Sequence, residues 1–437
     1  MPATSAAPDR IDLQNLPEPL YLGSVQTLYP IPDHPAWLLC ETTEAGSVFD
    51  VGSIFHIEGS DLNRALFRHA AYTRLSHPAT WAAVKAKIEG DTALPSDWKA
   101  DLLSGPMDAM LESGASTHHL GMVDAATHEV ITTGLPSAPS AFNIVRRFPV
   151  LTPPLRTVLG NHVFDYAQFH QSNTYVIPLE YIVRFGITSG SSIYKHYLSM
   201  SESERRSYEE ELGLAGPMEP WKMLDRPIFD LTSKYEPQDR NVSKQEALLM
   251  SGLSAAMFSD TIKMALLGGW AIRERLEAIG LQLWDLKWEF AVDHDTLLFV
   301  DTIDSDSFRA TGTLVVDGRR VVVHYNKQAM RDYYKILHPE WFAGINRAKT
   351  DARSAGQPFK PFLQAGQAAG TYPPTPNVEA EFLDIQSRKS ALIRDFITDT
   401  AAADTVKSGL EALGCEEVQF YTQHQRLNEL LALNALD

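Results

Sequence analysis

The segment Leu281–Phe308 constrains the fold more than any other part of the sequence. Within Trp284–Phe290, large apolar residues alternate with the charged residues Asp285, Lys287 and Glu289. Successive side chains of a β-strand point to opposite faces, so the alternation predicts a strand with one apolar face that must be buried. The other face then carries a negative, a positive and a negative side chain, spaced about 7 Å apart.

A second apolar run, residues 297–300, follows a short polar turn and leads to Asp301. This pattern predicts a β-hairpin whose returning strand places Asp301 beside the charged row. Two neighbouring carboxylates can bind Mg²⁺ together with substrate phosphates, and the lysine between them can neutralise a phosphate or a reacting carboxylate. The alternative is a solvated strand face with a cross-strand ion pair, and the spacing alone favours that interpretation.

Three further charged segments are candidates for binding anions. Arg184 lies in an apolar strand before the Gly/Ser/Thr-rich loop 186–192, where backbone N–H groups and a bidentate arginine could hold an anion. The alternative there is a surface turn after an edge strand. Lys234 lies in a polar loop that by itself indicates a solvated position. The third segment contains four charged residues: Arg309, Lys327, Arg331 and Asp332. By themselves, Lys327, Arg331 and Asp332 indicate a surface charge cluster.

Histidine and cysteine form no recognisable metal motif. The pair His118 and His119 has no third ligand at metal-binding spacing, which favours a loop over a zinc site. Cys40 and Cys415 lie far apart, so neither a disulfide framework nor a cysteine-based zinc site is expected. The sequence also lacks a Walker-type phosphate loop, a nucleophile elbow and a Rossmann fingerprint.

Composition restricts the classes of partner. The chain has 38 Lys and Arg against 55 Asp and Glu, a formal net charge of −17, which argues against binding nucleic acid or an anionic membrane surface. Hydrophobic residues make up 44% and charged residues 21%, which is ordinary for a globular protein with a core. We expect no signal peptide and no membrane span, and the cytoplasm is the simplest location.

The order of apolar runs predicts the fold class. Strands come first, helices occupy the middle, hairpins follow and helices end the chain, which is typical of an α+β fold rather than an alternating βαβ series. Residues 61–87 are expected to be helical. The length of 437 residues favours two domains. We expect a flexible tail over 1–18, a β-rich N-terminal lobe over 19–178 with an insertion around 90–170, an α+β lobe over 179–395, and a helical extension over 396–437.

Taken in order, these segments resemble one family, the phosphoribosylaminoimidazole-succinocarboxamide synthases, or SAICAR synthetases. The most specific resemblance is Gly280–Phe290, which is similar to the family motif G-L-x-L-x-D-x-K-x-E-F. The other segments that resemble family motifs are Leu20–Tyr29, Ser47–Asp50, Pro178–Arg184 with Thr188–Ser191, Pro227–Glu236, Asp301–Arg309, Asn326–Asp332 and Pro373–Pro376. The resemblance is discontinuous and runs from about residue 20 to 395.

The resemblance implies two lobes with an active site in the cleft between them. The small lobe is an antiparallel sheet akin to a kinase N-terminal lobe, and the large lobe is α+β. Family members use ATP to phosphorylate a carboxylate of an imidazole ribonucleotide, and the amine of aspartate then displaces phosphate to form an amide. By position, the resemblance implies Asp285 and Lys287 at the reacting groups, Glu180, Glu289, Asp301 and Lys234 at the nucleotide, Glu289 and Asp301 at Mg²⁺, and Asp50, Arg184, Ser191 and Arg309 at the substrate.

The sequence also departs from the family pattern. Ser24 and Gln26 replace both lysines of the first motif, and Ser60 stands near the place of a third. We therefore expect a divergent, specialised-metabolism ligase that uses ATP and Mg²⁺ to join a carboxylate and an amine. The expected partners are small molecules, such as aspartate or another amino acid and a phosphorylated or nucleotide-like acid. The oligomeric state is left open, a homodimer included. The alternatives are ATP-independent chemistry on the same fold, and ligand binding without catalysis.

Overall fold

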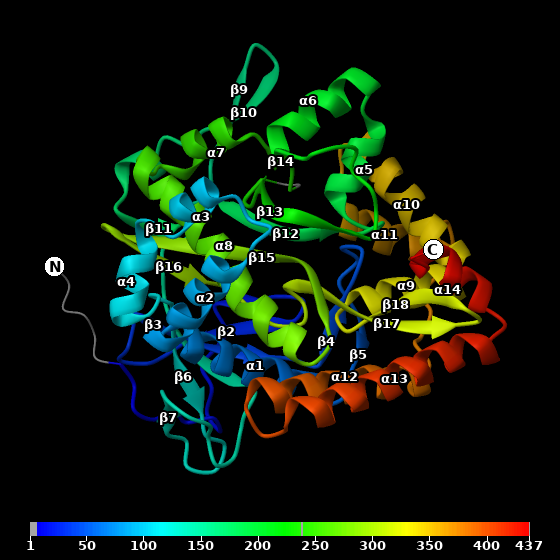
Figure 1. Cartoon of the computed structure of the whole chain (residues 1–437), viewed down its shortest axis with the longest axis horizontal. Helices are drawn as coiled ribbons and strands as arrows, with labels where there is room; N and C mark the ends of the chain where they lie inside the picture. The colour runs from blue at the N-terminus through cyan, green and yellow to red at the C-terminus, as the bar shows by residue number, and fades with distance from the viewer. Residues whose placement is uncertain (1–6, 237–238, 437) are drawn as a thin grey trace.

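The structure is a computed structural model that describes residues 7–236 and 239–436, and its two large sheets are both antiparallel (Figure 1). The smaller of them has six strands in the order β1-β2-β3-β8-β6-β7. These strands are β1 (Tyr21–Leu22), β2 (Gln26–Pro30), β3 (Trp37–Thr42), β6 (His119–Val123), β7 (Val130–Ile131) and β8 (Phe142–Arg146). Two separate hairpins pair β4 (Ala45–Ser47) with β5 (Ser53–His56), and β9 (Leu155–Val158) with β10 (Asn161–Phe164).

The larger sheet has eight strands and contains the charged row on its central strand. Its path is β14-β13-β12-β15-β17-β18, and two further strands, β11 and β16, pair with β15. The strands are β11 (Thr174–Val176), β12 (Leu179–Ile187), β13 (Lys222–Ser233), β14 (Asn241–Val242), β15 (Gln282–Asp293), β16 (Thr296–Val300), β17 (Phe308–Val316) and β18 (Arg319–His324). The two predicted hairpins are confirmed as β15–β16 and β17–β18.

Helices cover both sheets. They are α1 (Ser60–Leu75), α2 (Pro78–Gly90), α3 (Ser96–Leu102), α4 (Pro106–Ser113), α5 (Ser192–Ser199), α6 (Glu202–Leu212), α7 (Lys244–Ser251), α8 (Ala255–Ala278), α9 (Gln328–Leu337), α10 (Pro339–Ser354), α11 (Phe359–Ala368), α12 (Ala380–Ile397), α13 (Ala403–Gln423) and α14 (Leu427–Asn434), with one 3-10 turn at Phe169–Gln171. In Figure 1, α12 and α13 run side by side along one edge of the molecule and pass next to α1.

The apolar face of β15 is buried against α8, as the alternation predicts. Trp288 and Phe290 are at most 1% exposed, and both rings contact Phe299 of β16. Gly268 allows α8 to approach this cluster, because a Cβ there would lie 3.0 Å from both Phe299 and Trp288. Burial of these aromatic rings is the main apolar contribution that fixes the register of β15.

Several expectations about the fold can now be settled. The α+β class is confirmed. The helical stretch 61–87 is two helices, because Pro78 begins α2 and lacks the N–H that a continuous helix would need. Residues 1–6 of the expected tail lie outside the described residues, but Ile11 is 7% exposed and packs beside Leu39, so residues 7–18 are not a loose tail.

The lobe boundaries at 178 and 395 stay predictions. Among the residues that the structure describes, no helix is long and apolar enough to cross a membrane.

The C-terminal helices are joined to the larger sheet by a buried charge. Lys389 of α12 is 2% exposed, and its Nζ donates to Glu417 Oε2 of α13 at 2.6 Å and to the His324 carbonyl at 3.0 Å. Gln386 donates to the same Glu417 oxygen at 2.6 Å. Burial lowers the pKa of Lys389 despite the attraction of Glu417. This network therefore depends on both charges being present.

We predict that Glu417→Ala lowers the free energy of unfolding by about 3–5 kcal/mol, because it leaves the Lys389 ammonium buried and unpaired. The double variant Lys389→Met/Glu417→Leu should recover most of that loss, since no charge is then left unpaired. Urea unfolding followed by circular dichroism measures both variants. Equal destabilisation by the single and double variants would contradict the assignment. Lys85→Ala serves as control, because Lys85 pairs with Glu89 on an exposed helix face.

Candidate active site between the two sheets

A cavity of about 620 Å³ lies between the two large sheets, and we call it the interlobe cavity. The smaller sheet contributes apolar side chains such as Leu28, Leu38 and Val145, and the larger sheet contributes Val176 and Val300. Its volume is within the range of pockets that enclose small-molecule ligands. Apolar walls of this kind suit a flat organic group, whereas one end of the cavity is charged.

The charged end contains the row that the sequence predicts, brought together by strand pairing. Glu289 pairs with Val300 in the β15–β16 hairpin, which places Asp301 beside Glu289. Lys287 Nζ lies 2.6 Å from Glu180 Oε1 of β12, 2.7 Å from Glu289 Oε1 and 3.8 Å from Asp301 Oδ2. Lys234, which follows β13, forms a second ion pair with Glu289. Five residues from four segments therefore meet at one point.

The pKa values of Glu289 and Asp301 are shifted in opposite directions. Glu289 is 3% exposed, and although burial opposes its ionisation, Lys287 and Lys234 hold its pKa below the ordinary value. Desolvation, followed by the charge of Glu289, raises the pKa of Asp301 to about 6. The two carboxyl groups also hydrogen-bond to each other. Two adjacent carboxylates of this kind fit a divalent cation, which would remove their mutual repulsion.

The described residues include no group of three or more His, Cys, Asp or Glu arranged to hold a metal ion. Glu289 and Asp301 are a pair, and a pair suits Mg²⁺, which usually keeps water and substrate phosphates among its ligands. The loop expected at His118 and His119 is wrong for the second residue, because strand β6 begins at His119. Both rings line the interlobe cavity, and burial lowers the pKa of His118 to about 3.

The other end of the charged row is held by arginines. Arg184 of β12 is 1% exposed and donates through Nε and Nη2 to Asp230 of β13, at 2.6 and 2.9 Å. Its Nη1 lies 3.0 Å from Asp285 Oδ2, and Arg309 Nη1 of β17 lies 2.7 Å from the same oxygen. Asp285 is 6% exposed. The structure thus uses most donors of Arg184 to position Asp285.

The remaining predicted substrate residues lie apart from one another. Ser191 is buried and caps α5, where its side chain accepts a hydrogen bond from the Tyr194 N–H. The Asp50 carboxylate is exposed and pairs with Lys349 at 2.7 Å. A substrate role for these two residues and for Arg184 stays a prediction.

A group of cations surrounds the Asp285 end, and sequence analysis missed part of it. Burial lowers the pKa of Lys195 in α5, and the charges of Lys335, Arg309 and Arg331 lower it further. Burial and the charge of Arg309 likewise lower the pKa of Arg331. Arg331 was expected to be a surface charge, but it is only partly exposed and lies near the acids Asp306 and Asp332 as well as near Arg309.

Arg68 is the second functional candidate that sequence analysis missed. It projects from α1 into the wall of the interlobe cavity, is 4% exposed, and donates through Nε to Asp304 at 2.6 Å and through Nη1 to Thr42 Oγ1 at 2.9 Å. When the Gln26 amide is oriented with its oxygen towards Arg68, that oxygen accepts from Arg68 Nη1 at 3.1 Å and from Nη2 at 3.0 Å. Arg68 therefore places a cation beside one position where a family lysine is missing. The only sequence signal for Arg68 was an arginine within the apolar pattern of the predicted helix.

The solvated-face interpretation of the charged row is wrong. Asp285 and Glu289 are 6% and 3% exposed. Glu289 lies on the wall of the interlobe cavity, and Asp285 is held between Arg184 and Arg309.

Comparison with known proteins agrees with the geometry of this site. Residues 149–347 match the family model for SAICAR synthetase, and this region includes all of the β15 row, Glu180, Lys234 and Asp301. The chain is 29% identical over 241 residues to a protein of Archaeoglobus fulgidus assigned as a phosphoribosylaminoimidazole-succinocarboxamide synthase, covering 54% of this chain and 65% of that protein. It is 30% identical over 168 residues to the phosphoribosylaminoimidazole-succinocarboxamide synthase of Thermoplasma volcanium, covering 38% and 54%.

Two solved structures are also similar. The SAICAR synthase of Saccharomyces cerevisiae, solved with SAICAR, has a TM-score of 0.49 at 16% identity and covers 89% of this chain and 97% of that chain. A type-2 SAICAR synthetase solved with ADP has a TM-score of 0.40 at 18% identity and covers 71% and 89%.

The fold and the site together define a class of protein. It is a two-sheet α+β protein with a buried row of acids and lysines at one end of the interlobe cavity. Within that class, the chain is similar to SAICAR synthetases over residues 149–347, as the resemblance implied. Its matches span between half and two thirds of the length of these two relatives.

The raised pKa of Asp301 predicts a pH-dependent contribution to stability. Because the folded state binds a proton at Asp301 more readily than the unfolded state does, this group adds stability as the pH falls from about 6 towards 4. Asp301→Asn should remove that gain. Urea unfolding between pH 4 and 7 tests the difference, and carbon NMR of the carboxyl group should show a midpoint near pH 6. An Asp301 carboxyl that titrates near its ordinary pKa of 3.8 would contradict the assignment.

Proposed function

We propose that this protein is an ATP-dependent ligase that joins a carboxylate to an amine through an acyl-phosphate intermediate. One observation supports this most: Glu180, Lys287, Glu289, Asp301 and Lys234 meet at the charged end of the interlobe cavity. All five lie within residues 149–347, which match the SAICAR synthetase family model. The reaction class of that family is therefore proposed here for the same residues.

The nucleotide is proposed to occupy the interlobe cavity with its base against the apolar walls. Its phosphates then face Lys234 and Lys287, whose ammonium groups can neutralise anionic oxygens. Glu289 and Asp301 would hold Mg²⁺, which supplies charge neutralisation at the phosphates. Asp301 must be ionised to act in this way, and its raised pKa places that requirement close to neutral pH.

The carboxylate substrate is proposed to bind at the Asp285 end, where the space is positively charged. Arg309 and Arg331 and the amine of Lys195 provide the cations that an acid or a phosphorylated acid needs. A substrate carboxylate oxygen attacks the γ-phosphorus of ATP, the bond to ADP breaks, and an acyl phosphate forms. The amine nitrogen then attacks the acyl carbon, phosphate leaves, and the nitrogen loses a proton. Lys287 lies between the two ends, where it can steady charge in both steps.

Arg68 supports continued use of ATP despite the missing lysines. The positions of Ser24 and Gln26 lack a charge, but the Arg68 guanidinium lies in contact with Gln26. Relocating the cation from a strand to α1 keeps positive charge at the wall of the cavity. A changed cation position also supports a substrate that differs from the housekeeping imidazole ribonucleotide. The ATP-independent and non-catalytic alternatives rest on the missing lysines, and Arg68 weakens that argument.

We predict that Glu289→Gln reduces ADP release in the presence of Mg²⁺, ATP and a substrate pair by at least about 10³-fold. The loss of the Glu289 charge removes a proposed metal ligand and the carboxylate that pairs with Lys234, while Lys287 keeps its ion pair with Glu180. Circular dichroism should show that the fold is kept. Glu89→Gln is the matched control on an exposed helix face. Unchanged turnover in Glu289→Gln would return the row to a structural role.

We predict that Arg68→Ala weakens ATP binding by roughly tenfold or more, equivalent to about 1.4 kcal/mol. Arg68→Lys should lose less, because it keeps the charge that pairs with Asp304. In the Arg68→Ala background, Gln26→Lys should recover affinity by restoring a cation at the adjacent position. Calorimetric titration with Mg²⁺–ATP measures all three variants. Equal ATP affinity in the wild type and Arg68→Ala would rule out the relocated cation.

A further inference from the structure

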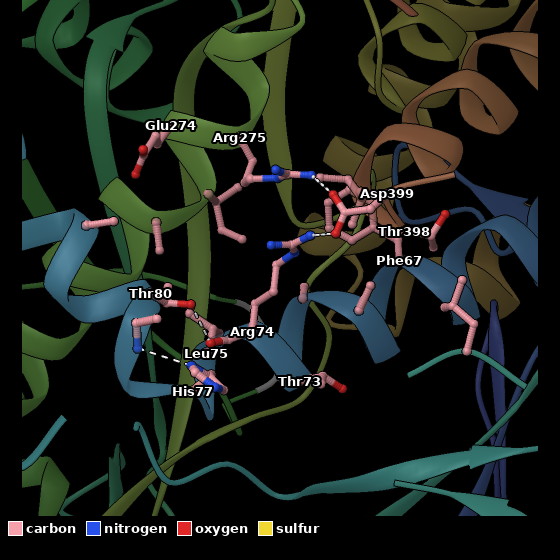
Figure 2. A pocket seen from close by; sticks show the side chains of 18 of the residues that line it. Phe67, Thr73, Arg74, Leu75, His77, Thr80, Glu274, Arg275, Thr398 and Asp399 are labelled. Atoms are coloured by element: carbon pink, nitrogen blue, oxygen red, sulfur yellow. Dashed lines mark hydrogen bonds and ion pairs between the residues drawn. The ribbon is translucent and has the colours of Figure 1, made fainter. Parts of the chain in front are cut away.

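A second cavity, of about 530 Å³, lies against a different face of α1 and is separate from the interlobe cavity (Figure 2). Its walls come from α1, α2, α8 and the end of α12, together with Gly134 and Leu135. Apolar side chains such as Phe67, Ala71 and Ile272 form much of the lining. The cavity is large enough to enclose a small organic molecule.

Two arginines from different helices converge at one end of this second cavity. Arg275 Nη2 of α8 lies 2.9 Å from Asp399 Oδ1, and Arg74 of α1 forms an ion pair with the other oxygen of Asp399. Figure 2 shows both guanidinium groups directed at this single carboxylate. The Asp399 side chain is 63% exposed, on the turn after α12. A single exposed carboxylate therefore pairs with both arginines. The acidic group of a ligand can take its place.

At this end of the second cavity, Arg275 lies near Arg74 as well as near the acids Asp399 and Glu274. Burial lowers the pKa of Arg275, and the neighbouring charge of Arg74 lowers it further. The Nε–H of Arg275 is buried, and it has no hydrogen-bond partner among the described residues. The hydroxyl of Thr73, on the cavity wall, is also buried without a hydrogen-bond partner among the described residues. Glu274 also lies on the wall, but Figure 2 shows its carboxylate away from Asp399.

We propose that the second cavity binds a small organic acid, with its acidic group at Arg74 and Arg275 and its apolar body against the alanine-rich wall. A guanidinium pair recognises an acidic group through several charge-assisted hydrogen bonds. The ligand acid takes the place of the Asp399 carboxylate or joins it, and so offsets the repulsion between the two arginines. The proposal does not depend on the reaction in the interlobe cavity.

The test uses the full chain and 1-naphthoate as the probe, measured by calorimetric titration. The wild type should bind 1-naphthoate at least tenfold more tightly than it binds the neutral 1-naphthalenemethanol. Arg74→Gln/Arg275→Gln should weaken binding of the acid by at least tenfold. Asp399→Asn should strengthen it, because the arginines lose their internal competitor. The control is Arg146→Gln, which removes an arginine from the interlobe cavity and should leave the affinity unchanged.

Three results would overturn the proposal. One is no binding of 1-naphthoate by the wild type at millimolar concentration. Another is loss of affinity in Arg146→Gln but not in Arg74→Gln/Arg275→Gln, which would place the probe in the interlobe cavity. The third is unchanged or weakened binding in Asp399→Asn. This last variant keeps the test decisive if the double arginine variant fails to fold, because Asp399 is largely exposed.

Discussion

Glu289 is a carboxylate buried at 3% exposure, and the site depends on how its charge is compensated. Lys287 comes from the same strand face, Lys234 from the segment after β13, and Asp301 from the end of the adjoining strand. An unpaired ion at this depth would cost several kcal/mol, so these segments must be in register before the charge can be accommodated. Strand pairing and charge pairing thus determine each other at the centre of the larger sheet.

The same constraint explains why the charges alternate along the site. Glu180 neutralises Lys287 from β12, whereas Asp285 is neutralised by Arg184 and Arg309 on its two flanking strands. Glu289 instead pairs with Lys287 on its own strand and with Lys234 after β13, so every charge of the row has a protein partner. A rigid and preorganised row is also what transfer of a phosphoryl group between two anions needs. Stability and proposed chemistry therefore use the same side chains.

The smaller sheet and α1 complete the site from the other side. Arg68 connects α1 to Asp304 and to Gln26, so the helix carries into the cavity a cation that the β2 strand lacks. The opposite side of α1 carries Arg74 into the second cavity. The helix therefore carries a buried arginine, Arg68, towards one cavity and a half-buried arginine, Arg74, towards the other.

The sequence by itself determined the β15 strand, its hairpin, the neighbouring positions of Glu289 and Asp301, and the α+β class, because these follow from side-chain alternation and short-range turns. Only the tertiary structure decided that Asp285 and Glu289 are buried and that Arg68 of α1 reaches the wall of the interlobe cavity. Those features depend on contacts between residues far apart in the chain, as between Arg68 and Asp304. Spacing along the sequence carries no information on which surface will cover a strand, so the choice between a solvated and a buried row belonged to the fold.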